Sequence, residues 1–108
     1  MGISALIIAK NEENKIKQCL ESITFADEIV IVLDRTSDHT EEIVKKFTKK
    51  IFKGNWEFEG DRRNFGINKC KNNWILEVDA DEIISSKLAK EIKKNVSNDN
   101  YDFFYIKL

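Results

Sequence analysis

Residues 3–9 read ISALIIA, an almost unbroken apolar run that is long enough for a β-strand. A strand that is apolar on both faces is typical of the interior of a parallel sheet, where other elements cover each face. Residues 28–34, EIVIVLD, have the same character and are rich in β-branched side chains. These two runs predict the centre of a parallel sheet.

Helices are predicted after both of these strands. After the first, apolar residues recur at the helical spacing i, i+3, i+4 and i+7, at Ile16, Cys19, Leu20 and Ile23. Asn11 is a preferred N-cap residue, so we expect this helix to begin just after it, with Glu12 and Glu13 at the positive end of its dipole. Asp38 and Glu41 are spaced as a capping box for the helix after the second strand.

The rest of the chain continues this alternation. In order, we expect a strand at 50–54, a helix from about Asp61 to Asn72, a strand at 73–78, a helix capped by Ser85 or Ser86, and an edge strand at 101–108. Strands that alternate with helices predict an α/β fold, with a mostly parallel sheet of about five strands and helices on both faces. A chain of 108 residues is expected to form one domain, 1–108.

Composition argues against several classes of function. The formal net charge is −1, so no bulk positive field favours nucleic acid as a partner. No apolar run approaches the roughly 18 residues that span a bilayer, and the N-terminus lacks the basic leader of a signal peptide. Cys19 and Cys70 are expected on helices as free thiols, which favours a reducing compartment. We expect a cytoplasmic protein without a transmembrane segment.

Polar and acidic side chains follow the ends of three predicted strands. The first strand is followed by Asn11 and Glu12, the second ends at Asp34, and the fourth is followed by Asp79 and Asp81. Ligands of open α/β sheets bind beyond the carboxyl ends of the strands. Because nothing in the fold requires acidic groups at these positions, the pattern predicts a binding site at this edge.

Asp79 and Asp81 are predicted to bind a divalent cation. If the chain stays extended there, both side chains project to the same side, with Cα atoms roughly 6.5 to 7 Å apart. Two such oxygen ligands suit Mg²⁺ or Mn²⁺, whereas the lack of a cysteine and histidine cluster disfavours structural zinc. An isolated Asp-x-Asp is more often a solvated loop, but the preceding strand and the other polar strand ends favour a metal site here.

Other candidate residues have two readings. Asp34 either caps the next helix or accepts a hydrogen bond from the imide N–H of a uracil ring, and the residues alone leave this open. Arg62 and Arg63 lie at the positive start of a helix, which suits a nearby phosphate, with surface solvation as the alternative. Trp56 and Phe58 are expected to pack over the sheet, with contact to a ligand as the alternative. His39 has no nucleophile beside it in the sequence, so we expect a surface residue.

Three segments together resemble family 2 glycosyltransferases of the GT-A fold, most closely the lipopolysaccharide-core glucosyltransferase type. Residues 5–23, ALIIAKNEENKIKQCLESI, are similar to the opening strand and helix of that family. Residues 26–40, ADEIVIVLDRTSDHT, are similar to its second strand and turn. Residues 56–82, WEFEGDRRNFGINKCKNNWILEVDADE, are similar to the segment that leads into its Asp-x-Asp motif. The motifs occur in the family's order and spacing.

The resemblance implies a metal-dependent, inverting glycosyltransferase. Such an enzyme would be cytoplasmic, either free or bound peripherally to the inner face of the membrane. Its donor would be a nucleotide-diphosphate sugar, with UDP favoured, and its acceptor a cell-envelope glycan or a lipid-linked acceptor. The resemblance implies that Asp34 holds the base and that Asn11 and Glu12 line the nucleoside pocket. Arg63 would approach the diphosphate. Asp79 would contact the ribose or sugar and, with Asp81, bind Mn²⁺ or Mg²⁺.

The chain departs from this family in two respects. The turn after Asp34 reads Arg-Thr-Ser-Asp, where the family usually has a glycine. Family members are also longer, and their second half holds the acceptor site and the catalytic base. We therefore expect the N-terminal, donor-binding half, without an assigned catalytic base. A non-catalytic nucleotide- and metal-binding fragment is one alternative. A haloacid-dehalogenase-type phosphohydrolase is less favoured, because its Asp-x-Asp follows the first strand.

Overall fold

The computed structural model describes residues 2–96 and 104–107. Strands and helices alternate along the chain as β1 (Ile3–Ala9), α1 (Ile16–Ser22), β2 (Glu28–Asp34), α2 (Thr40–Val44), β3 (Ile51–Gly54), α3 (Glu59–Lys69), β4 (Trp74–Glu77), α4 (Ser86–Val96) and β5 (Phe104–Lys107). The five strands form one sheet in the order β3-β2-β1-β4-β5, and each neighbouring pair is parallel. The predicted α/β fold is confirmed, with a sheet that is entirely parallel in the described residues.

The strand β1 lies in the middle of the sheet, as its continuous apolar sequence predicts. It pairs with β2 on one side and with β4 on the other, and six of its seven residues are buried. Successive side chains of a strand point to opposite faces. Ala5 and Ile7 therefore join the hydrophobic core on one face, whereas Leu6 joins the core on the other.

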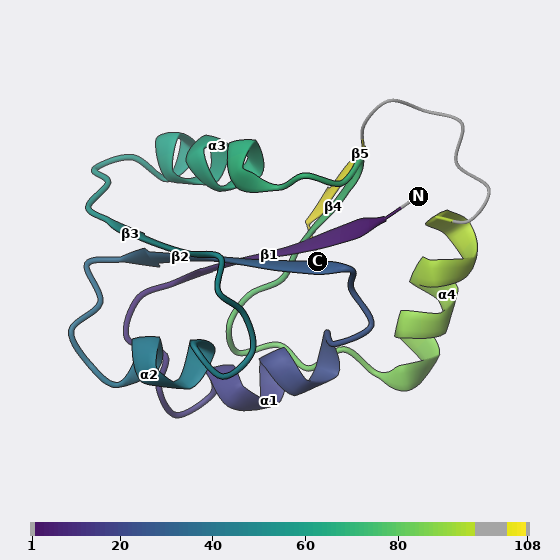
Figure 1. The fold of residues 1–108 in the computed structure, drawn as a ribbon, viewed down its shortest axis with the longest axis horizontal. Helices are drawn as coiled ribbons and strands as arrows, with labels where there is room; N and C mark the ends of the chain where they lie inside the picture. The colour runs from purple at the N-terminus through teal and green to yellow at the C-terminus, as the bar shows by residue number, and fades with distance from the viewer. Residues whose placement is uncertain (1, 97–103, 108) are drawn as a thin grey trace.

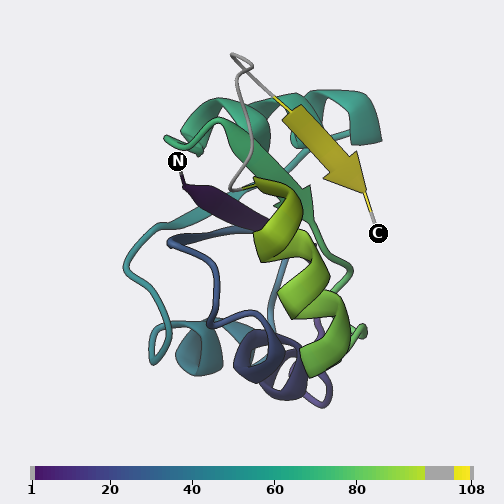
Figure 2. The same cartoon turned by 90° about the vertical axis from the view of Figure 1, so that its right-hand side faces the viewer.

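Helices cover both faces of the sheet, as predicted. Figure 1 shows α3 above the sheet and α1 and α2 below it. The helix α4 is seen from the side at the front of Figure 2. It packs on the same core as α1 through Leu88, Ile92 and Val96. Among the described residues, no helix is long and apolar enough to cross a membrane.

The helix α3 approaches the sheet closely at Gly66. A Cβ atom there would lie 2.8 Å from Cδ1 of Leu6 and 3.2 Å from Cγ2 of Val32, so a larger residue would push the helix off the strands. The helix starts and ends two to three residues earlier than the predicted Asp61 to Asn72. It ends because Cys70 adopts an extended conformation, with φ of −81° and ψ of 136°.

The predicted N-cap of α1 at Asn11 is wrong. The helix begins at Ile16, and Lys15 occupies the N-cap position. Asn11 instead has a φ of 52°, and its Oδ1 accepts hydrogen bonds from the amides of Ser37 at 2.8 Å and Asp38 at 3.2 Å. Asparagine tolerates this left-handed conformation better than most residues. The two glutamates after it therefore precede the helix rather than lie in its first turn.

The predicted capping box of α2 is also wrong. Asp38 accepts hydrogen bonds from the Thr40 amide at 2.9 Å and from the Glu13 amide at 3.2 Å. Glu41 does not complete the box, because its carboxylate forms an ion pair with Lys53 at 3.2 Å. Asp38 therefore joins the loop before α2 to the segment before α1.

Several other sequence predictions are confirmed. Oγ of Ser85 accepts a hydrogen bond from the Leu88 amide at 3.1 Å, as a cap of α4 should. The strand β5 lies at an edge of the sheet, and the rest of its predicted range falls outside the described residues. Both cysteines are free thiols, and Cys19 is buried in α1 as expected, whereas Cys70 lies directly after α3 and not on the helix.

Two glycines of α3 should respond oppositely to substitution. Gly66→Val should lower the free energy of unfolding by about 1 to 3 kcal/mol, because the side chain overpacks the core beneath the helix. Gly60→Ala should raise it by about 0.5 to 1 kcal/mol, because alanine favours the helix and an added Cβ has nothing within 4 Å. Denaturant unfolding measures both changes. A Gly66→Val chain as stable as the wild type would contradict the close packing of α3.

Candidate functional site at the carboxyl edge of the sheet

A cavity of about 340 Å³ lies at the carboxyl edge of the sheet. It is lined by residues that follow β1, by residues that follow β4, and by one residue of α3: Ile8, Ala9, Lys10, Glu12, Arg62, Asp79, Ala80 and Asp81. The polar residues after the first and fourth strands therefore meet, as the sequence predicts. Two cationic side chains of the lining face three carboxylates.

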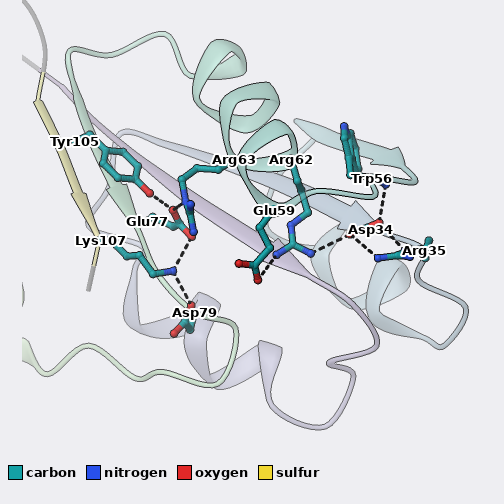
Figure 3. Close-up of polar contacts among 10 residues, drawn as sticks. All are labelled: Asp34, Arg35, Trp56, Glu59, Arg62, Arg63, Glu77, Asp79, Tyr105 and Lys107. Atoms are coloured by element: carbon teal, nitrogen blue, oxygen red, sulfur yellow. Dashed lines mark hydrogen bonds and ion pairs between the residues drawn. The ribbon is translucent and has the colours of Figure 1, made fainter.

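Asp34, at the end of β2, lies behind this cavity and is completely buried. Its carboxylate accepts hydrogen bonds from Nη1 of Arg62 at 2.9 Å, Nε of Arg35 at 3.1 Å and the Trp56 amide at 3.2 Å (Figure 3). Burial raises the pKa of Asp34, but these donors outweigh it and hold the pKa below its usual range. Asp34 therefore binds α3 to the sheet.

Arg62 reaches the cavity from α3. Besides its bond to Asp34, its Nη2 lies 3.5 Å from Oε1 of Glu59. Its Nε is buried and has no hydrogen-bond partner among the residues that the structure describes. The guanidinium lines the cavity together with Asp79 and Asp81. Arg62 could not be preferred over Arg63 from the sequence, because both arginines lie at the start of the same helix.

Arg63 belongs to a neighbouring cluster around Glu77. Its Nε donates to Oε1 of Glu77 at 3.0 Å, and Glu77 also accepts hydrogen bonds from Tyr105 and, at 3.1 Å, from Lys107 (Figure 3). Burial raises the pKa of Glu77, but the three donors outweigh it and lower the pKa. Nζ of Lys107 lies 3.7 Å from Oδ1 of Asp79, so the cluster adjoins the cavity.

Sequence reasoning missed Glu77. The signal that it offers is a charged residue inside an otherwise apolar strand that is predicted to be covered on both faces. A carboxylate in that position needs donors, which the residues Tyr105 and Lys107 of β5 supply together with α3.

The chain turns after β4, so the extended geometry in which Asp79 and Asp81 would project to the same side is not the one adopted. The Glu82 amide donates to the Asp79 carbonyl at 2.9 Å, and Oε1 of Glu82 accepts a hydrogen bond from the Asp79 amide, also at 2.9 Å. Asp79 and Asp81 are exposed, and both line the cavity despite the turn. Within residues 2–96 and 104–107, no three carboxylate, histidine or cysteine side chains are grouped so that they could hold a metal ion.

Asn11 and Glu12 lie on the segment between β1 and α1. Glu12 lines the cavity, and both residues line an adjoining hollow of about 180 Å³ with Asn14 and Lys15. The Glu12 amide donates to Oγ1 of Thr40 at 2.9 Å, which holds this segment against α2. The structure thus brings Asn11 and Glu12 close to the acidic residues after β4.

Two residues that the sequence assigned to structural roles behave as expected. The side chain of His39 is 72% exposed and lies 3.5 Å from Oε1 of Glu42. Trp56 packs against Phe65, with ring centroids 5.0 Å apart. Neither side chain lines the cavity. Phe58 is 61% exposed, so the expectation that it packs over the sheet is wrong.

Comparison with known proteins identifies the family. The family model described as "Glycosyl transferase family 2" matches residues 4–107. The chain belongs to this family. The resemblance stated from the sequence is therefore confirmed, and family membership argues against the phosphohydrolase alternative.

Two relatives illustrate the similarity in sequence. The chain is 36% identical, over 93% of its length, to an uncharacterized glycosyltransferase of Rickettsia bellii. It is 30% identical, over 83% of its length, to the lipopolysaccharide core biosynthesis glycosyltransferase LpsC of Rhizobium meliloti. It covers 34% and 35% of these proteins, so it spans about a third of their length.

Solved structures show the same fold. A crystal structure of Staphylococcus aureus TarS 1-349 matches the chain with a TM-score of 0.73 and 26% identity, over 90% of this chain and 32% of that one. The structure of TarS 1-349 in complex with UDP matches with a TM-score of 0.72 and 24% identity. The predicted GT-A arrangement of a parallel sheet with helices is therefore confirmed.

Acid should destabilise the chain through Asp34 and Glu77. Their folded-state pKa values are lowered, so their contribution is present above the unfolded values of about 4 and is lost as the pH falls through the folded values. Asp34→Asn should lower the free energy of unfolding by about 2 kcal/mol at neutral pH, because Arg62 loses a charged partner. It should also make the free energy of unfolding fall less steeply as the pH is lowered. Urea unfolding between about pH 7 and pH 2 measures both effects.

The control for this measurement is Asp61→Asn, which removes an exposed carboxylate of α3. It should keep most of the acid dependence of the wild type. If Asp34→Asn and the wild type lose stability with the same slope below about pH 4, the buried ion pair is not the source of that dependence.

Proposed function

We propose that this chain is the donor-binding part of a metal-dependent, inverting glycosyltransferase. It would bind a nucleotide-diphosphate sugar, with UDP as the nucleotide, for transfer to a cell-envelope glycan or a lipid-linked acceptor. The observation that carries the proposal is the cavity at the carboxyl edge, where Asp79 and Asp81 face Arg62 and Lys10. Membership in glycosyl transferase family 2 supports the class of reaction.

The charges around the cavity suit a diphosphate only together with a cation. Asp79 and Asp81 would repel the diphosphate, and the charge of Arg62 is already offset by Asp34. A divalent ion held by Asp79 and Asp81 would offset this repulsion. Mg²⁺ is typically held by one or two carboxylates, with phosphate oxygens and water as its other ligands. Two aspartates without a third protein ligand fit that pattern, and Mn²⁺ accepts the same oxygen ligands.

The chemistry requires stabilisation of a leaving group. When the glycosidic bond to the nucleoside diphosphate breaks, negative charge develops on the departing phosphate. A bound divalent ion supplies Lewis-acid stabilisation of that charge. Lys10 also lines the cavity and adds positive charge there. An acceptor hydroxyl would attack the sugar from the far side, and no catalytic base is assigned to this chain.

Asn11 and Glu12 are proposed to line the nucleoside pocket, because they border the hollow next to the cavity. Asp34 reaches a base only after a donor leaves it, since its side chain is 1% exposed. Arg35 is the more easily displaced donor, because its side chain is 46% exposed whereas that of Arg62 is 22% exposed. Recognition of the base by Asp34 therefore implies a movement of Arg35.

Arg63 is retained as a proposed ligand of the diphosphate. Its guanidinium is bonded to Glu77, which adjoins Asp79 through Lys107. A diphosphate at Asp79 would therefore lie next to this cluster.

Two similar proteins support the choice of nucleotide and acceptor. TarS, which is 26% identical to this chain, is named poly(ribitol-phosphate) beta-N-acetylglucosaminyltransferase and has been solved in complex with UDP. LpsC is named for lipopolysaccharide core biosynthesis. The UDP complex of TarS supports a UDP-sugar donor here, and the name of LpsC supports an envelope acceptor.

A non-catalytic nucleotide- and metal-binding module is the second candidate. It is favoured by the fact that the chain spans about a third of the relatives that it matches. Incubation with UDP-sugars separates the two candidates. Release or transfer of the sugar supports an enzyme, whereas metal-dependent binding without turnover supports the module.

Titration of UDP with and without Mn²⁺ tests the donor site. We expect binding that requires the ion and that weakens about 10- to 100-fold in Asp81→Asn, as is common when a metal site is impaired. The matched control, Asp61→Asn, should bind as the wild type does. Amide NMR shifts with Mg²⁺ should change around Asn11 and Asp79. Equal UDP affinity without any divalent ion, or no binding at millimolar UDP, would contradict the proposal.

A further inference from the structure

Helix α1 holds both ends of the loop at 79–84, which we call the acidic turn. The Cys19 thiol donates to the carbonyl of Asp79, with a sulfur-to-oxygen distance of 3.4 Å. Three residues further along the helix, Oγ of Ser22 accepts a hydrogen bond from the Ile84 amide at 2.9 Å. One short helix therefore binds the backbone of the acidic turn where it begins and where it ends.

The two bonds are not equivalent. A thiol is a weak donor, whereas the Ser22 hydroxyl makes an ordinary hydrogen bond. The hydroxyl is itself oriented, because it donates to the carbonyl of Cys19 at 2.7 Å. Cys19 is fully buried and Ile84 is 6% exposed, so water cannot readily replace these partners. Ser22 should therefore carry the larger share of the attachment.

The acidic turn is also fixed from within. Glu82 bonds to both the amide and the carbonyl of Asp79, so its carboxylate closes the turn. Ala80, between the two aspartates, is 5% exposed and joins the core beneath α1 together with Ile84. With the backbone held at these points, Asp79 and Asp81 line the cavity.

The same segment of chain is attached to the loop before α2. The Glu12 amide bonds to Oγ1 of Thr40, and the Glu13 amide bonds to Asp38. The loops that follow β2 and β4 are thus joined through the segment that contains α1. The segment after β1 and the acidic turn, which both line the cavity, are therefore connected through α1.

We propose that Ser22 and Cys19 are positioning residues of the cation site. They act through the backbone of the acidic turn, which they hold so that Asp79 and Asp81 already face the cavity. A mobile loop would have to be ordered when the ion binds, and the lost conformational entropy would weaken the affinity. This inference rests on the proposed function, because it takes the two aspartates as ligands of the ion.

The test compares Ser22→Ala with Ser22→Thr in the whole chain. Loss of one hydrogen bond should weaken Mn²⁺ binding in the presence of UDP roughly three- to tenfold. The free Mn²⁺ signal in electron paramagnetic resonance measures this affinity. Hydrogen exchange of the Ile84 amide should become faster in Ser22→Ala, with or without Mn²⁺. Ser22→Thr keeps the hydroxyl and should restore both properties.

Thr48→Val is the matched control. It also removes a side-chain hydroxyl that bonds to a backbone carbonyl, that of Ile29 at 2.8 Å, but at the amino end of β2. It should lower thermal stability and leave Mn²⁺ affinity unchanged. If Thr48→Val weakens Mn²⁺ binding as much as Ser22→Ala does, the effect is general destabilisation and the inference is wrong.

The remaining outcomes separate this inference from the function on which it rests. Wild-type affinity for Mn²⁺ in Ser22→Ala, together with loss of binding in Asp81→Asn, overturns the positioning role and leaves the donor site standing. A wild-type chain that binds neither Mn²⁺ nor UDP overturns the proposed function and this inference with it. Faster exchange at Ile84 with unchanged Mn²⁺ affinity restricts Ser22 to a structural role, which also contradicts the inference.

Discussion

A carboxylate that is buried in a sheet must be surrounded by donors, and this requirement determines how α3 lies on the strands. Asp34 and Glu77 are buried on β2 and β4, and each accepts hydrogen bonds from three donors. Two adjacent arginines of α3 divide the task, Arg62 with the first and Arg63 with the second. Loss of one partner would leave a buried charge that costs several kcal/mol. The helix is therefore held across the sheet by two ion pairs.

The same arrangement shapes the cavity. Arg62 reaches from α3 to Asp34 at the end of β2. In this position it lines the cavity together with the turn after β4. Positive and negative side chains thus line the same cavity at the carboxyl edge of the sheet. Structural ion pairs and the candidate ligand site share residues here, so a substitution in one will affect the other.

The strands and their order along the chain could be predicted because their signal is local. The apolar runs at 3–9 and 28–34 need no information from elsewhere in the sequence to be recognised as strands. The helix boundaries were less accurate. Asn11 is a good N-cap residue in isolation, but its side chain bonds to amides of the loop before α2, which sequence spacing cannot reveal.

The site shows the same division. The convergence of Asp79 and Asp81 with the segment after β1 could be predicted, because a strand precedes them and other polar strand ends accompany them. The distinction between Arg62 and Arg63 depends on which way each side chain leaves the helix, and this is settled only when α3 rests on the sheet. Glu82 directly follows the two aspartates in the sequence, yet its carboxylate accepts a hydrogen bond from the Asp79 amide. The partners of these three side chains depend on tertiary contacts, which local sequence patterns do not reveal.

The position of β1 in the sheet has a consequence for how the chain is made. Its partner β2 follows after one helix, but its other partner β4 comes only after α2, β3 and α3 as well, and it pairs Trp74 with Ile3, far earlier in the chain. During synthesis one edge of the most apolar strand must wait until β4 has left the ribosome. An unpaired apolar edge is a template for wrong pairing with another chain. Nascent chains that stop before β4 should therefore need chaperones more than the finished domain does.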